Sequence, residues 1–165
     1  MLGLEPTLGG KKMMRILLTA VFAWSALLAE TVPAQNSETK VNLEGLPPAV
    51  QQAVKAQSQG ATLRGVAKEL KDGVTLYEAE MTVHGRTKDI IFDAQGKILT
   101  VEEQTTLNKI PAAARAAIQK AVGAGKLVLV EKVTRGEKTF YEGHITQGLK
   151  ASEVIVDANG KPVQF

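Results

Sequence analysis

The amino-acid sequence predicts an α+β fold with tandem α-β-β-β-β repeats, in which an antiparallel sheet has the helices packed on one face. Two observations support this prediction. Residues 46–101 align with residues 110–165 in one register without a gap, and self-similarity at a fixed period is typical of repeated structural units. Short turns also separate the apolar runs within each half, and strands joined by short turns are antiparallel neighbours.

The chain begins with the features of an export signal. Residues 16–29 (ILLTAVFAWSALLA) are apolar or small, and Lys11, Lys12 and Arg15 precede them. This run is shorter than the roughly 20 apolar residues that a membrane-spanning helix needs. A basic start, a short apolar run and a small-residue exit are typical of a secretory signal peptide. We therefore expect a periplasmic or secreted protein.

Val32-Pro33-Ala34 predicts signal cleavage after Ala34. The alternative interpretation of the apolar run is a buried core helix, which the absence of a polar face disfavours. Residues 1–12 add nothing to the signal, so the true start is expected at Met13 or Met14. No membrane span is expected to remain after cleavage.

Each half is expected to open with a helix. Leu46-Pro47 and Ile110-Pro111 place proline at the first helical position, where its missing N–H costs nothing. Leu46, Val50 and Val54 follow at helical spacing. Gly60 and Gly123 are expected to end the two helices.

Four strands are expected after each helix. Turn sequences such as Asp72-Gly73 and His84-Gly85 separate the strands. The expected strands are 62–70, 74–83, 87–93 and 97–103 in the first half, and 126–134, 138–146, 151–157 and 161–165 in the second. The predicted organisation is a signal peptide at 1–34, a flexible lead at 35–45, repeats at 46–103 and 110–165, and a connector at 104–109.

Strand alternation separates the side chains of each strand into two faces. Tyr77, Ala79 and Met81 form an apolar set that should face the helices. The opposite face mixes acidic and apolar residues, and exposed apolar groups bordered by charge can mark an interaction surface. The alternative interpretation is an ordinary solvent face whose apolar residues reflect β-propensity. The candidate binding face comprises Leu76, Glu78, Glu80, Ile91, Phe140, Glu142, His144 and Ile155.

Three segments carry a family resemblance: L-P-x-A-V-x-x-A-V at 46–54, D-G-V-T-L-Y-E at 72–78, and I-I-F-D-A-Q-G-K-I-L at 90–99. The chain from 46 to 165 resembles the PepSY-like family, also described as β-lactamase-inhibitor-like, in two tandem copies. The second half departs from the pattern at Arg135-Gly136-Glu137 and at Lys161-Pro162. The resemblance implies a small exported bacterial binding module whose open sheet face contacts its target, with peptidase inhibition proposed for the broader group. A shared fold does not imply inhibition of a β-lactamase.

The residues do not indicate an enzyme, a resident metal or a cofactor. The absence of cysteine excludes disulfides, thiolate metal sites and a cysteine nucleophile. His84 is expected in a turn and His144 on an outward strand position, so neither pairs with a nucleophile as catalysis requires. Asp93 and Asp157 are interpreted as turn residues. Weak divalent-metal binding through Glu80, Glu142 and His144 is the open alternative.

The functional hypothesis is therefore an exported, non-catalytic module that binds a protein or peptide in the cell envelope and resembles a peptidase or other enzyme inhibitor. The alternative is a periplasmic sensor or carrier of a metal ion or small ligand. A nucleic-acid partner is not expected. The net charge is only +3, and the basic residues form no run with interleaved aromatic residues. Exposed edge strands could pair two chains, and the sequence leaves the oligomeric state open.

Overall fold

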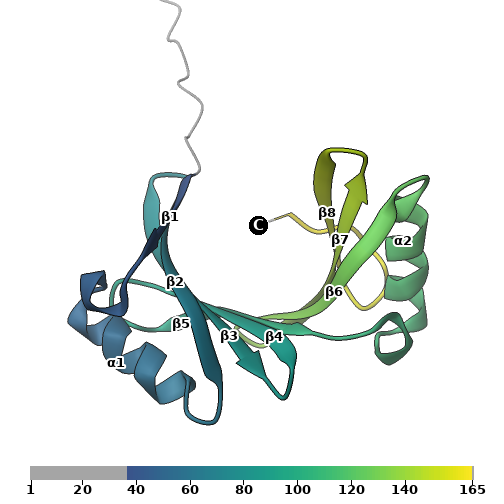
Figure 1. Ribbon diagram of the computed structural model, residues 1–165. Coiled ribbons are helices and arrows are strands. Elements are labelled where there is room, and N and C mark those ends of the chain that lie inside the picture. Colours follow the sequence, from purple (N-terminus) through teal and green to yellow (C-terminus); the bar gives the residue numbers. More distant parts are fainter. Residues whose placement is uncertain (1–36, 165) are drawn as a thin grey trace, which may run out of the picture. The chain divides into compact units, whose positions relative to one another are not determined.

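The computed structural model describes residues 37–164, which belong to one compact unit (Figure 1). The predicted signal peptide, 1–34, and the predicted starts at Met13 and Met14 lie outside the described residues. No helix within 37–164 has both the length and the apolar character to cross a membrane. The elements in chain order are β1 (Ser37–Val41), η1 (Leu43–Gly45), α1 (Pro48–Gln57), β2 (Thr62–Lys71), β3 (Val74–Val83), β4 (Arg86–Phe92), β5 (Ile98–Gln104), η2 (Leu107–Lys109), α2 (Ala112–Val122), β6 (Lys126–Arg135), β7 (Lys138–Gln147) and β8 (Lys150–Val156).

The predicted fold class is wrong, because the strands form one eight-stranded antiparallel sheet rather than two α-β-β-β-β repeats. The order across the sheet is the chain order from β1 to β8. β5 pairs on both of its edges: Val101 lies opposite Ile90 of β4 and opposite Thr134 of β6. The sheet is therefore continuous through β5, and no boundary between repeats interrupts it.

The ends of the sheet also differ from the prediction. Residues 35–45 were expected to be a flexible lead, but β1 forms there and pairs with β2 from Ser37–Leu70 to Val41–Val66. A last strand was expected at 161–165, but a single bridge joins Val156 to Pro162. Proline has no N–H to donate to a strand ladder, which opposes a strand there. The other predicted strands agree with the observed ones to within one residue at each end.

The two helices begin as the prolines suggested, with a shift of one position. Pro47 and Pro111 are the N-cap residues of α1 and α2, so the first helical residues are Pro48 and Ala112. Gly123 follows α2 with φ of 53°, a left-handed conformation that glycine adopts without a steric cost.

Two apolar clusters join the helices to the sheet. α1 contributes Val50 and Val54 to a cluster with Met81, Ile90 and Phe92, among others. α2 contributes Ala114 and Ile118 to a second cluster that includes Val130 and Val156. The strand register puts both clusters on the same face of the sheet. Figure 1 shows this arrangement: the sheet is curved, and both helices lie on its convex side.

Close backbone contacts dock the helices on the turns after β4 and β8. A Cβ atom at Gly96 would lie 2.6 Å from the carbonyl oxygen of Ala49, and one at Gly160 would lie 2.6 Å from that of Ala113. Both glycines also have φ near 77°, at 76° and 78° respectively. Only glycine allows this conformation and this approach together. The opposite side of the sheet, which we call the concave face, carries no helix of residues 37–164.

Candidate binding face

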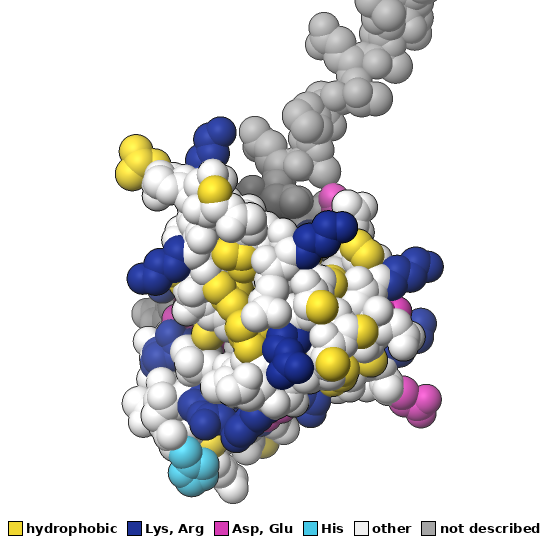
Figure 2. All heavy atoms as spheres, turned by 90° about the vertical axis from the view of Figure 1, so that its right-hand side faces the viewer, with side chains coloured by type: hydrophobic (Ala, Val, Ile, Leu, Met, Phe, Trp, Pro, Cys, Tyr) yellow, Lys and Arg dark blue, Asp and Glu magenta, His cyan; other side chains and the backbone are white. Residues whose placement is uncertain are grey.

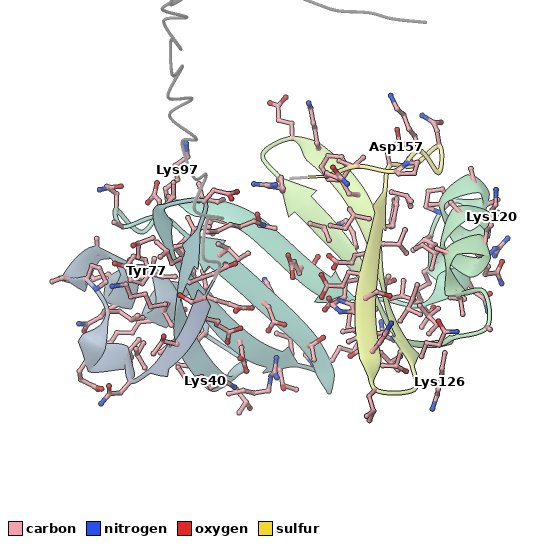
Figure 3. All side chains as sticks on the ribbon, turned by 90° about the horizontal axis from the view of Figure 1, so that it is seen from above. Lys40, Tyr77, Lys97, Lys120, Lys126 and Asp157 are labelled. Carbon is pink, nitrogen blue, oxygen red and sulfur yellow. The ribbon has the colours of Figure 1, made fainter. Side chains whose placement is uncertain are left out.

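A line of acids crosses the concave face. Glu80 of β3 lies opposite Asp89 of β4, and Asp89 lies opposite Glu102 of β5. Further along the sheet, Glu131 of β6 lies opposite Glu142 of β7. We call these five residues the acidic strip. Figure 3 looks onto this face from above, with Lys40 of β1 in its left half and β8 in its right half.

All eight residues of the predicted binding face lie on the concave face, as alternation along each strand requires. The register gives each a defined neighbour: Glu78 lies opposite Ile91, and Ile155 lies opposite Glu142. Most are half-buried, and Glu142 is buried with 5% of its surface exposed. The prediction that these residues share a face agrees with the register, whereas their role in binding stays a prediction.

Four further acids lie on this face outside the predicted binding set, although strand alternation already predicts that Asp89 and Glu153 point outward. Asp89, Glu102 and Glu131 belong to the acidic strip, and Glu153 lies beside it opposite His144. The signal that could have found Glu102 and Glu131 is their position next to the inward-facing Val101 and Val130. Their juxtaposition depends on pairing through β5, which the predicted repeat boundary had placed at the end of a unit.

Like charges on directly opposed strands destabilise a sheet, and burial adds a cost for each charged group. Burial, followed by the nearby carboxylates of Asp89 and Glu38, raises the pKa of Glu78 to about 7. Burial, followed by Glu131 and Asp89, raises the pKa of Glu102 to about 7. Strongly perturbed carboxylates on an open face are typical of functional sites.

Two cations balance one end of the acidic strip. The Nη2 atom of Arg64 lies 2.8 Å from Oδ1 of Asp89, and its Nη1 atom lies 3.6 Å from Oε2 of Glu80. Lys40 reaches the other oxygen of Glu80 at 3.4 Å. Burial still raises the pKa of Asp89, although Arg64 opposes this shift. These half-exposed ion pairs are each worth about 1 kcal/mol or less.

At the other end, His144 lies among three glutamates. Its Nε2 atom is 2.8 Å from Oε2 of Glu131 and 3.7 Å from Oε1 of Glu142, and its Nδ1 atom is 3.3 Å from Oε1 of Glu153. The hydrogen bond with Glu131 is the largest cause that raises the pKa of His144, to about 9. Burial, followed by Glu102, raises the pKa of Glu142 to about 8.

The residue set suggested for a metal does not come together. Glu142 and His144 are neighbours on β7, but Glu80 lies on β3, and three strands separate the two positions. Glu153 takes the place of Glu80 beside them, while Glu80 groups with Glu38 and Glu78. His84 lies in an exposed turn with φ of 49°, as the sequence predicted.

Charge is unevenly distributed between the two faces of the sheet. A hollow on the helix-bearing side is lined by Arg86, Lys88 and Lys132, with Glu103 as its acid. Figure 2 shows the side of the molecule that carries α2, where Lys and Arg side chains outnumber the acidic ones. The acids therefore gather on the concave face, even though the whole chain carries a net charge of +3.

Comparisons with known proteins identify relatives of the fold. No protein-family profile matches the chain, and no curated protein matches it. A crystal structure of a Bacteroides eggerthii protein provisionally assigned to the periplasm is 18% identical, with a TM-score of 0.57, covering 72% of this chain and 86% of that one. A DUF2874 family protein from Bacteroides uniformis is 19% identical, with a TM-score of 0.54, covering 72% and 86%.

A BLIP-like protein from Bacteroides fragilis is 25% identical, with a TM-score of 0.49, covering 70% of this chain and 82% of that one. The structures with TM-scores above 0.5 show that this fold occurs in bacterial proteins of the DUF2874 family.

Proposed function

We propose that this protein is an exported, non-catalytic binding protein that holds a basic segment of a protein or peptide partner against its concave face. The observation that carries the proposal is the acidic strip on the concave face, which neither α1 nor α2 covers.

Charge complementarity determines the class of partner. Glu80, Asp89 and Glu102 oppose one another directly across three strands, with Arg64 and Lys40 paired at one edge only. A Lys or Arg side chain placed beside Glu102 would relieve this repulsion. Complementary charge raises the association rate and the specificity of such a complex.

Apolar side chains beside the acidic strip supply contact area. Ile91, Phe140 and Ile155 are half-buried on the concave face, so part of each side chain still meets solvent. Burial of apolar surface contributes about 25 cal/mol per Å². A partner with alternating basic and apolar residues would therefore match this surface better than a uniformly basic one.

Such binding would inhibit an envelope peptidase or another enzyme with a basic substrate cleft. The inhibitor-like role would then consist of blocking that cleft. His144 supports a non-catalytic role. Its raised pKa, about 9, keeps the imidazole protonated at neutral pH, and a protonated imidazole cannot act as a general base. The export signal expected at residues 1–34 supports a location in the cell envelope.

The test measures the binding of defined peptides by fluorescence anisotropy. The ligands are a labelled Lys/Arg-rich peptide with interspersed apolar residues and its Glu-rich counterpart of equal length. We expect the basic peptide alone to bind, and its affinity to fall with added salt because exposed charges are screened. Equal binding of the two peptides, or binding that salt leaves unchanged, would refute the charge argument.

The variants Glu78→Gln and Glu102→Gln replace carboxyl groups with an amide of the same shape. We expect the double variant to bind the basic peptide about tenfold more weakly, since two lost charge pairs worth up to about 1 kcal/mol each together approach the roughly 1.4 kcal/mol that a tenfold change requires. Glu44→Gln with Glu137→Gln is the matched control, because both residues are exposed and lie outside the strands. Equal affinities of the test and control variants would show that the acids of the concave face do not bind the peptide.

A further inference from the structure

We propose that Glu142, His144 and Glu153 bind a divalent transition-metal ion of the zinc type. The three side chains come from the adjacent strands β7 and β8, with His144 directly opposite Glu153. One ligand atom from each residue lies within 4.8 Å of the other two. The inference goes beyond the proposed partner binding: Glu142 also belongs to the acidic strip, but the ligand here is a metal ion and its test uses no peptide.

Glu131 holds the imidazole ring of His144 in place. Its Oε2 atom lies 2.8 Å from Nε2 of His144, and its Oε1 atom accepts a hydrogen bond from the Thr87 hydroxyl at 3.3 Å. Its side chain is 2% exposed. A metal-bound histidine almost always donates its second N–H to such a carboxylate, which fixes the tautomer and the ring orientation. Metal binding releases protons from its ligands, so the ion displaces the Nδ1 proton of the imidazolium, and the lone pair that this frees faces Glu153.

The distance between two of the proposed ligand atoms already suits a small ion. Ligand atoms at about 2.1 Å from a tetrahedral zinc ion lie about 3.4 Å from one another. Nδ1 of His144 and Oε1 of Glu153 are already 3.3 Å apart. The Glu153 side chain is 60% exposed, so it can adjust its rotamer around the ion. The open side of the face leaves the remaining coordination position to water.

The charge around His144 favours a cation independently of this spacing. Among residues 37–164, His144 is the ion-pair partner that lies within 4 Å of Glu142, at 3.7 Å. The same imidazole also lies within 4 Å of carboxylate oxygens of Glu131 and Glu153. Three carboxylates thus share one imidazole, and Glu131 and Glu142 are both more than nine-tenths buried. A divalent ion adds positive charge at a place where one imidazole is shared by three acidic side chains.

The donor atoms select the kind of metal. Imidazole nitrogen together with carboxylate oxygen suits Zn²⁺ and its neighbours in the first transition row. Ca²⁺ instead takes six to eight oxygen ligands. The second acidic group, Glu38, Glu78 and Glu80 at the other end of the concave face, has no imidazole, and we make no proposal for it.

Calorimetric titration of the exported protein, purified without an affinity tag, tests this site with Zn²⁺ as the probe. We expect one Zn²⁺ ion per chain, and Ca²⁺ at the same concentration should not displace it. Glu153→Gln should weaken Zn²⁺ binding by at least about tenfold, the scale on which even outer-shell changes act. This variant should fold normally, because Glu153 is exposed.

His144→Gln should abolish the binding, and circular dichroism checks that this variant folds. His84→Gln is the matched control, since it removes the other histidine of residues 37–164 from an exposed turn. Three results would each overturn the proposal: the absence of saturable binding up to about 1 mM Zn²⁺, an equal loss in His84→Gln, or unchanged affinity in Glu153→Gln.

Discussion

Single glycines determine how closely the helices approach the sheet. Gly143 of β7 faces α2 and is buried. A Cβ atom there would lie 2.7 Å from Cγ2 of Ile118 and 3.2 Å from Cδ1 of Leu127. Gly143 does not have a positive φ, so glycine is required here only because there is no room for a Cβ atom. α2 can therefore pack directly against the backbone of β7.

We expect Gly143→Ala to destabilise the protein by about 1–3 kcal/mol, because overpacking a core forces side chains or backbone to shift. Urea denaturation followed by circular dichroism measures the change. Gly65→Ala in β2 is the control, since its Cβ would meet nothing closer than the Glu80 carboxylate at 3.6 Å. A loss in Gly65→Ala as large as that in Gly143→Ala would show that strand glycines matter here for another reason.

At the scale of elements, aspartate-based turns set the geometry between strands. The Oδ1 atom of Asp93 accepts hydrogen bonds from the backbone N–H groups of Gln95 and Lys97, both at 2.9 Å. Asp157 makes the same two bonds with Asn159 and Lys161. The sequence interpretation of both residues as turn formers is confirmed. Because Gly96 lies within the first of these turns, its geometry also positions α1.

We expect Asp93→Ala to lower the free energy of unfolding by about 1–2 kcal/mol, since two backbone donors lose their shared acceptor. The thermal midpoint measured by calorimetry should fall accordingly. Gln95→Ala changes an exposed side chain in the same turn and should leave the midpoint nearly unchanged. Equal midpoints for wild type and Asp93→Ala would contradict the structural role given to this carboxylate.

The acidic concave face affects the stability of the whole molecule. Glu78 and Glu102 have pKa values raised from 4.5 to about 7. In the folded state these groups hold protons that the unfolded chain releases at lower pH. Their contribution to stability is complete below pH 4.5 and is lost as the pH rises through about 7. His144, raised from 6.5 to about 9, acts in the same direction over a higher range.

We therefore expect the protein to be more stable at pH 5 than at pH 8, with a thermal midpoint higher by roughly 5 °C. Measurements with a chelator present exclude effects of bound metal. Glu78→Gln with Glu102→Gln should reduce this difference, because neutral amides cannot titrate, whereas Glu137→Gln in an exposed turn should preserve it. A midpoint that rises from pH 5 to pH 8 would contradict the burial of these acids.

The sequence predicted most strand bounds because the signals are local. Two-residue turns such as Asp72-Gly73, where both φ angles are positive, mark hairpin ends without reference to distant residues. It did not predict the strand at Ser37–Val41, which is polar and mostly exposed. Its partners in β2 are distant in sequence, and only the edge of the folded sheet offers the hydrogen bonds that hold it.

For the candidate site, too, the sequence predicted the local features but not the contacts between distant strands. Alternation along β3 and β7 alone placed Glu78, Glu80, Glu142 and His144 on the face away from the helices. Which of these residues meet depends on the order of the strands, which local pattern does not encode. Hence the sequence could not separate Glu80 from His144, or bring Glu153 to it.

By itself, the sequence determined most of the local elements and the face that each strand residue occupies, because period and turn chemistry are local properties. Only the tertiary structure decided that β5 joins everything into one sheet, that the acids align across it, and that His144 lies among three glutamates. Those features depend on hydrogen bonding between strand edges and on burial, both of which exist only in the folded chain.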